Sequence, residues 1–180
     1  MIAMTELRTA HSADLDADAR KAIRMLLDAA FEGDFSDTDW DHALGGVHVL
    51  VREDGELIAH GAVVQRRLLH AGRALRTGYV EGVAVRADRR GQGHGARVMT
   101  ELERVIRGGY VLGALSAADD AAGFYAARGW QAWQGRTCVL SPSGMERTPE
   151  DDGSTFVLPV GPAPDLTGVL VCDWRDGEVW

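Results

Sequence analysis

The stretch YVEGVAVRADRRGQGHGA, which spans Tyr79–Ala96, decides the fold prediction. Its first part, Tyr79–Val85, carries β-branched residues in near alternation and is typical of a strand. Arg86–Gly95 is basic and rich in glycine, which is typical of a turn. Ala96–Arg107 then places apolar residues at helical spacing. The stretch therefore predicts a strand, a glycine-rich loop and a helix, in that order.

The composition of this loop is suited to binding phosphate. Gly91, Gly93 and Gly95 lack a Cβ atom, so the backbone can turn sharply and approach a ligand closely. Successive backbone N–H groups in such a turn form an anion-binding concavity, to which the helix that follows adds its N-terminal N–H groups. The chain carries a formal net charge of −8, yet this loop holds a cluster of positive side chains. These are Arg86, Arg89 and Arg90.

Three kinds of phosphate loop were compared with this sequence. A Walker loop requires Gly-Lys-Ser/Thr and is excluded by Gly93-His94-Gly95-Ala96. The dinucleotide pattern G-x-G-x-x-G/A matches, but no repeated βαβ series follows it, and the usual acidic residue about 20 positions on is not evident. The third pattern begins at Arg90-Gly91-Gln92-Gly93 and follows a strand of the form V-x-x-V-A-V. It resembles the acetyl-coenzyme A loop of the GNAT acyltransferases; the alternative is a solvated turn.

Length and composition favour a single globular domain over residues 1–180. Hydrophobic residues make up 46% and charged residues 26% of the chain, and no apolar run of about 18 residues predicts a membrane span. Cys138 and Cys172 lie in apolar runs and are expected to be reduced core residues, which favours a cytoplasmic location. The six histidines show no metal-ligand spacing, so no metal is expected.

The predicted elements place a meander of antiparallel strands before the loop and a parallel strand, 110–115, after the helix. Residues 141–153 are expected to form a loop. The fold class is α/β (α+β). The predicted helices are 16–31, 37–43, 96–107 and 117–128, and the predicted strands are 6–9, 47–52, 57–69, 76–85, 110–115, 130–140, 156–160 and 169–173.

The chain also resembles one group of GNAT enzymes nearly from end to end, the aminoglycoside 2'-N-acetyltransferases of actinobacteria. Four motifs carry this resemblance: Gly33-Asp34-Phe35 with Thr38-Asp39-Trp40, Gly78–Arg86, Thr148-Pro149 with Asp151-Asp152-Gly153, and Cys172-Asp173-Trp174-Arg175 with Trp180. The segment Gly123–Trp130 matches the wider GNAT pattern. The resemblance implies a GNAT fold: a mixed central sheet, mostly antiparallel, with a splayed parallel strand pair and flanking helices. It also implies a homodimer, acetyl-CoA as cosubstrate and an aminoglycoside as acceptor.

The same resemblance implies where acetyl-CoA binds. The pantetheine arm would hydrogen-bond the backbone of Val83 and Val85, and the Val83 N–H would point at the thioester oxygen. In this family the loop often has bulkier residues where this chain has Gly93, His94 and Gly95. The implied cofactor-binding residues are Val83, Ala84, Val85, Arg90, Gly91, Gln92, Gly93, His94 and Gly95.

Tyr125 matches the family tyrosine that gives a proton to the coenzyme A thiolate, a reaction that suits a phenol with a pKa near ~10. The alternative is an interior aromatic residue of a helix beside Phe124. Glu81 and the terminal carboxylate of Trp180 are both candidates for the base, acting through water. Glu81 is alternatively a carboxylate that binds a substrate ammonium without moving a proton.

Aminoglycosides are polycations, and an acidic protein attracts them over long range. Trp40 or Trp180 could stack on a sugar ring, although core packing is an equal alternative for Trp40. The expected substrate-binding residues are Asp34, Asp39, Glu81, Gly82, Ser116, Glu150, Asp151, Glu178 and Trp180.

Two other functions stay open at this point. One is acetylation of a protein N-terminus or a small cellular amine, and the other is a sensor that binds acetyl-CoA or drug without turnover. No nucleic-acid or membrane partner is expected.

Overall fold

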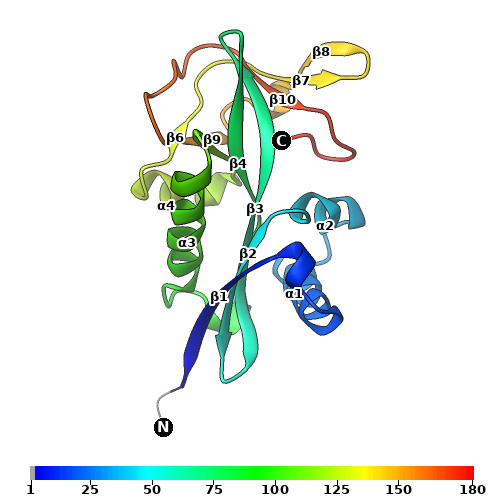
Figure 1. Ribbon diagram of the computed structural model, residues 1–180, viewed down its shortest axis with the longest axis vertical. Helices are drawn as coiled ribbons and strands as arrows, with labels where there is room; N and C mark the ends of the chain where they lie inside the picture. Colours follow the sequence, from blue (N-terminus) through cyan, green and yellow to red (C-terminus); the bar gives the residue numbers. More distant parts are fainter. Residues whose placement is uncertain (1–2) are drawn as a thin grey trace. The chain divides into compact units, whose positions relative to one another are not determined.

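The computed structural model describes residues 3–180 (Figure 1). The chain divides into two compact units. The first unit consists of the chain up to Val64 together with Val80–Arg104, and the second consists of Gln65–Tyr79 with Val105–Trp180. Two long strands and one helix contribute residues to both units. They are β3 (Glu56–His70), β4 (Arg73–Val85) and α3 (His94–Gly109).

The strands of the first unit lie in the order β1, β2, β3 and β4. β1 (Thr5–His11) and β2 (Val47–Glu53) pair antiparallel, and so do β2 and β3. The turn between β2 and β3 has Asp54 at φ 50° and Gly55 at φ 86°. Positive φ at both central residues is the type I′ geometry that matches strand twist, so the predicted hairpin is confirmed.

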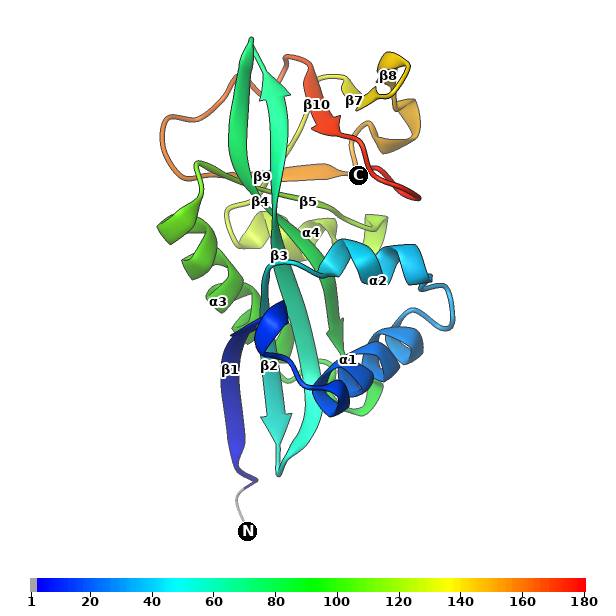
Figure 2. The ribbon, with the colours of Figure 1, turned by 45° about the vertical axis from the view of Figure 1, so that its right-hand side comes forward.

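Helices cover both faces of the strands in the first unit (Figure 2). Asp16 caps the start of α1 (Ala17–Ala30), and Ser36 caps the start of α2 (Asp37–Ala43) in a capping box with Asp39. A Cβ at Gly61 would contact Val98 of α3, whereas one at Gly82 would contact Leu27 of α1. The two helices therefore pack on opposite faces.

On the α1 face the core of this unit is apolar and well defined. α1 contributes residues at helical spacing, and the strands contribute residues that point to the same face. The buried members are Ala10, Leu15, Ile23, Leu26, Leu27, Phe35, Leu50 and Ala84.

In the second unit the strands, which include the other parts of β3 and β4, lie in the order β6-β9-β5-β4-β3-β10-β7-β8. β4 and β5 pair in parallel through Thr77–Tyr79, and β10 pairs in parallel with β7. Four further pairs are antiparallel: β10 with β3, β5 with β9, β6 with β9, and β7 with β8. The predicted mixed, mostly antiparallel α/β architecture is confirmed. The elements are β5 (Leu112–Ser116), α4 (Ala122–Ala127), β6 (Gln131–Ala132), β7 (Thr137–Ser141), β8 (Gly144–Arg147), β9 (Thr155–Pro159) and β10 (Leu170–Asp173).

Three local predictions in the second unit are wrong. The predicted strand 130–140 is two strands, because the chain at Gly135 runs against other backbone: a Cβ there would lie 1.9 Å from the Gly168 carbonyl oxygen. The predicted loop 141–153 contains β8, which forms a hairpin with β7. The predicted helix 117–128 is a 3₁₀ turn, Asp119–Ala121, followed by the short α4.

Both cysteines are free and buried, as predicted. Over residues 3–180, none of the helices combines the length and the hydropathy that a membrane crossing requires.

Candidate active site

The glycine-rich loop of the first unit has the backbone geometry of an anion site. Gly91 lies at φ 73° and Gly93 at φ 84°, a region that side-chain-bearing residues rarely adopt. The first helical hydrogen bond of α3 joins the Arg97 N–H to the Gly93 carbonyl at 3.0 Å. The N–H groups before Arg97 have no acceptor within the helix, so they are free to bind an anion.

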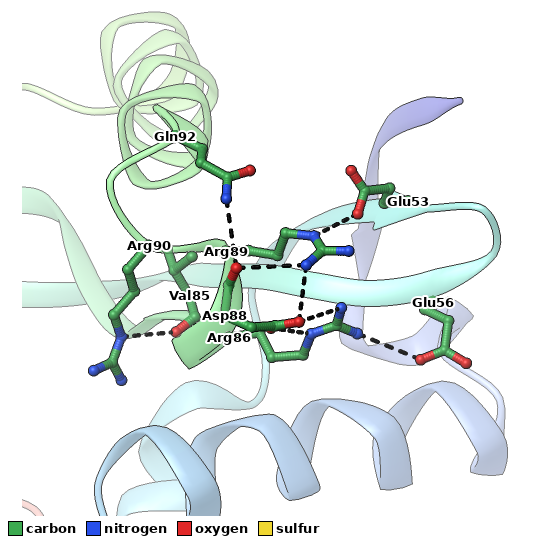
Figure 3. A network of polar contacts seen from close by, with 8 residues as sticks. All are labelled: Glu53, Glu56, Val85, Arg86, Asp88, Arg89, Arg90 and Gln92. Atoms are coloured by element: carbon green, nitrogen blue, oxygen red, sulfur yellow. Dashed lines mark hydrogen bonds and ion pairs between the residues drawn. The ribbon is translucent and has the colours of Figure 1, made fainter. Parts of the chain in front are cut away.

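The three arginines of the loop differ in how far carboxylates neutralise them (Figure 3). Arg86 contacts Asp88 at 2.6 Å and Glu56 at 3.4 Å, and its hydrogen bonds lower the pKa of Asp88. Arg89 binds Glu53 and also contacts Asp88 at 2.8 Å. These two arginines are neutralised by carboxylates and hold the loop in place.

Arg90 differs from its neighbours because its guanidinium hydrogen-bonds a carbonyl, that of Val85, at 3.2 Å (Figure 3). Across residues 3–180 no carboxylate forms an ion pair with it. It is also exposed, so it is the loop arginine whose charge a phosphate can reach. Gln92 Nε2 donates to the Asp88 carbonyl at 3.4 Å, and the buried His94 side chain leaves Nδ1 without a hydrogen-bond partner among the described residues.

The end of β4 departs from regular strand geometry at Gly82, whose φ is 57°. Its carbonyl oxygen lies 2.8 Å from Nδ1 of His60, a residue of β3. Ala84 is buried in the core, whereas Glu81, Val83 and Val85 are partly exposed beside it. Sequence reasoning missed His60, because a histidine inside an apolar strand carries no signal of the carbonyl it will bind.

The acidic residues expected in the substrate site of this unit have two different environments. Asp34 is exposed. Asp39 caps α2: one of its oxygens accepts from the Ser36 N–H and hydroxyl, each at 2.8 Å. Trp40 is partly buried and packs against the core of the unit, which agrees with the core-packing alternative for this residue.

Tyr125 lies in α4 of the second unit and is 9% exposed. Its ring packs near Phe124, Trp130 and Phe156, with centroid separations of 5.1, 6.2 and 6.4 Å. Burial raises the pKa of its phenol, so the hydroxyl keeps its proton throughout the physiological range.

Two neighbouring carboxylates in this unit have opposite electrostatic environments. Asp152 accepts hydrogen bonds from Arg147 at 2.7 Å and from the Thr137 N–H at 2.9 Å, and these bonds lower its pKa. Burial raises the pKa of Asp151 to about 6, and the negative charges of Glu150 and Glu178 add to this effect. Three of the predicted substrate residues, Glu150, Asp151 and Glu178, therefore lie close enough to interact.

Trp180 is packed rather than exposed, with 5% of its surface accessible. Its indole Nε1 donates to Thr148 Oγ1 at 3.0 Å, and Thr148 in turn donates to Thr137 Oγ1 at 2.9 Å. The ring is therefore an anchor for this end of the chain and is not available for stacking on a sugar. Ser116, at the end of β5, is exposed and pairs with Thr155.

A search of residues 3–180 for groups of three or more His, Cys, Asp or Glu side chains that could hold a metal ion finds none. The predicted site residues fall in both units. The loop, Arg90 and the end of β4 belong to the first, and Tyr125 with the Glu150, Asp151 and Glu178 cluster belongs to the second.

Comparisons with known proteins identify the family of this chain. The model of the acetyltransferase (GNAT) domain matches residues 12–133. The chain is 59% identical to an aminoglycoside 2'-N-acetyltransferase of Mycolicibacterium fortuitum, covering 96% of this chain and 91% of that protein.

Solved structures share the fold at low sequence identity. A GNAT family N-acetyltransferase of Escherichia coli, in complex with CoA, superposes with a TM-score of 0.69 at 19% identity, covering 96% of this chain and 91% of that one. A GNAT family acetyltransferase of Brucella melitensis, in complex with acetyl-CoA, gives 0.63 at 20% identity, covering 93% and 94%. With a matching domain model, a close relative and these folds, the chain belongs to the GNAT acetyltransferase family.

Proposed function

We propose that this enzyme transfers the acetyl group of acetyl-CoA to the 2'-amine of aminoglycosides. The observation that carries the proposal is the 59% identity, along nearly the whole chain, to the aminoglycoside 2'-N-acetyltransferase of Mycolicibacterium fortuitum. The geometry of the glycine-rich loop in the first unit supports acetyl-CoA as the acetyl donor. Two alternative functions are acetylation of a protein N-terminus or small amine, and binding without turnover. An assay of CoA release with different amines distinguishes them from the proposed reaction.

The first unit would hold the coenzyme. The pyrophosphate would bind the N–H groups from Gly91 to Ala96, because two left-handed glycines turn the backbone toward it and α3 begins there. Arg90 would add a charge-assisted contact. The pantetheine arm would pair with the backbone of Val83 and Val85, and the Val83 N–H would stabilise the oxyanion that forms on the thioester carbonyl.

Proton transfer would involve two groups. Tyr125 would give the departing thiolate its proton, which its raised pKa keeps available. Glu81 would accept the proton of the 2'-ammonium through water, and the α-carboxylate of Trp180 is the second candidate for that task. Holding both substrates at once lowers the entropic cost of the reaction.

Carboxylates would bind the other ammonium groups of the drug. Asp34 is exposed in the first unit, and Glu150, Asp151 and Glu178 repel one another in the second, so cations would relieve that repulsion. Asp39, Gly82 and Ser116 are further proposed contacts. We also propose a homodimer that works in the cytoplasm, where acetyl-CoA is present.

The regiochemistry tests the proposed reaction. Kanamycin B carries a 2'-amine and kanamycin A a 2'-hydroxyl on otherwise closely matched rings. We expect CoA release with kanamycin B and little with kanamycin A, with the product acetylated at N2' by NMR. Acetylation at another amine alone would disprove the assignment, and a lack of CoA release with every aminoglycoside would favour the other functions.

A valine at Gly93 should weaken coenzyme binding specifically. The side chain would occupy the approach of the pyrophosphate and would strain a residue at φ 84°. We expect the acetyl-CoA KM to rise on the order of tenfold, about 1.4 kcal/mol of binding. Gly55→Val is the matched control, because Gly55 has φ 86° and open space around it but lies in the β2–β3 turn. Equal effects of the two variants on KM would contradict the loop assignment.

Replacement of Tyr125 by phenylalanine should lower kcat by about 10²-fold, because a general acid typically contributes that much. The ring contacts with Phe124 and Trp130 stay in place, so the melting temperature should change little. Stopped-flow measurement of CoA release would give kcat, and calorimetry would give acetyl-CoA affinity. An unchanged kcat would assign Tyr125 to packing alone.

The raised pKa of Asp151 predicts a pH dependence of drug recognition. Its carboxyl is ionised above about pH 6 and neutral below it, so its attraction for ammonium groups is lost as the pH falls through 6. The ratio of kcat/KM for wild type to Asp151→Asn should therefore be large at pH 8 and approach one at pH 5, since kcat/KM follows the free enzyme.

Glu150→Gln gives an internal check on this assignment. It removes a negative charge that raises the pKa of Asp151, so the midpoint of the same ratio should move to lower pH. A ratio that is constant between pH 5 and pH 8 would show that Asp151 does not bind the drug as a carboxylate.

A further inference from the structure

A continuous chain of hydrogen bonds, buried as far as His60, runs through the first unit to the end of β4. Ser12 Oγ lies 2.7 Å from His48 Nε2, and His48 Nδ1 lies 2.9 Å from His60 Nε2. His60 Nδ1 lies 2.8 Å from the Gly82 carbonyl oxygen. Ser12 is 6% exposed, and both histidines are fully buried at 0%.

Only one assignment of protons satisfies every bond in this chain with neutral rings. A carbonyl only accepts, so His60 carries its proton on Nδ1 and accepts at Nε2. His48 then donates from Nδ1 and accepts at Nε2 from the Ser12 hydroxyl. Ser12 Oγ accepts in turn from the Gly45 N–H at 2.9 Å. The Gly46 carbonyl, 3.4 Å from Ser12 Oγ, already accepts the Ser12 N–H at 2.9 Å.

Both histidines are neutral in this environment. Burial lowers the pKa of His48 to about 4 and that of His60 to about 3. The chain of donors and acceptors therefore keeps one direction, from Gly45 to Gly82, throughout the physiological pH range.

The last bond fixes the orientation of a whole peptide group. The Gly82 carbonyl and the Val83 N–H belong to one planar trans peptide, in which C=O and N–H point in opposite directions. None of the peptide bonds within residues 3–180 is cis. Because the carbonyl is held by His60, the Val83 N–H is directed away from His60.

We propose that His60, supported by His48 and Ser12, is a positioning residue that orients the Gly82–Val83 peptide so that the Val83 N–H faces the thioester oxygen of acetyl-CoA. This inference rests on the proposed role of the Val83 N–H. The chain orients and does not conduct protons, because it ends on a peptide carbonyl, which does not accept a proton at physiological pH.

Gly82 fits this arrangement because of its backbone. At φ 57° a side chain would strain the backbone, and a Cβ would lie 3.4 Å from Leu27 and 3.6 Å from the His60 ring. Glycine therefore permits the turned peptide, and the histidine chain holds it against alternative orientations.

The test uses two substitutions of His60. In His60→Asn the amide nitrogen occupies the place of Nδ1 and can donate to Gly82, whereas His60→Leu has similar bulk and no donor. We expect His60→Leu to lower kcat about 10- to 100-fold, somewhat less than the loss of an oxyanion donor. The acetyl-CoA KM should change less than threefold, and His60→Asn should recover most of kcat.

Ile58→Ala is the control for stability. Ile58 lies two residues before His60 on β3 and is fully buried, so its truncation destabilises the unit and leaves the hydrogen bonds intact. Kinetics well below each melting temperature should show near-normal kcat for Ile58→Ala. If it loses kcat as His60→Leu does, the effect is one of stability and the proposal is overturned.

Infrared spectra of bound acetyl-CoA, labelled with ¹³C at the acetyl carbonyl, read the oxyanion contact directly. Wild type should show a lower carbonyl frequency than free acetyl-CoA, and His60→Leu should lose most of that shift. No shift in wild type would disprove the role of the Val83 N–H, whereas a wild-type shift that persists in His60→Leu would disprove the role of His60 alone.

A measurement on wild type covers the case in which His60→Leu does not fold. Long-range ¹H–¹⁵N spectra of the imidazoles should show His48 and His60 neutral, each protonated at Nδ1, between pH 6 and 8. A proton on Nε2 of His60 would overturn the proposal, because the ring could not then donate to Gly82.

Discussion

The orientation of a single peptide, between Gly82 and Val83, is the constraint on which the first unit depends. The Gly82 carbonyl is partly buried, and a peptide carbonyl withdrawn from water without a partner is costly, so the turn at Gly82 requires a donor inside the protein. His60 supplies that donor, and it must itself be satisfied in the same apolar surroundings. His48 satisfies the second ring nitrogen of His60, and the Ser12 hydroxyl satisfies that of His48. Ser12 in turn accepts a hydrogen bond from the Gly45 N–H. One irregular residue in β4 thus dictates three buried polar residues on three other segments.

The charges are arranged on the same principle, that a group engaged in structure is unavailable for a ligand. Glu53, Glu56 and Asp88 neutralise Arg86 and Arg89, which leaves Arg90 as the loop cation open to phosphate. In the second unit Arg147 and Thr137 occupy Asp152 and lower its pKa. Its neighbour Asp151 receives no such support, and its pKa rises to about 6. Asp152 is therefore engaged in structure, whereas Asp151 is available for the proposed binding of a ligand cation.

Much of the fold follows from local sequence signals. Asp16 and Ser36 cap α1 and α2, and the Asp54-Gly55 turn joins β2 to β3. Caps and turns of this kind depend on nearby residues only. The predicted strand over residues 130–140 is wrong for a non-local reason. The approach of the Gly168 carbonyl to Gly135 is invisible in the sequence around Gly135. The loop glycines were found because they lie close together in one short stretch of the chain.

The candidate site was predictable to the same degree. Arg90, Gly91 and Gly93 could be found from one short motif, whereas the neutralised state of Arg89 depends on Glu53, a residue 36 positions away. His60 was missed for a related reason: 22 residues separate it from the carbonyl that it binds. An isolated histidine in an apolar strand is usually a core residue with satisfied hydrogen bonds. The role of His60 becomes visible only when its partner, the Gly82 carbonyl, is known.

A polar chain in this place has a physical advantage over apolar packing. Dispersion contacts fill space but distinguish poorly between two orientations of one peptide, since carbonyl and N–H occupy similar volumes. A hydrogen-bond donor at 2.8 Å distinguishes them fully, because the flipped peptide would set N–H against N–H. With both histidines neutral, the chain adds no net charge near the site, so the small partial charge of one N–H is not obscured. Neutral, directional and fully satisfied hydrogen bonds therefore suit the control of one backbone donor better than either ionic or apolar contacts.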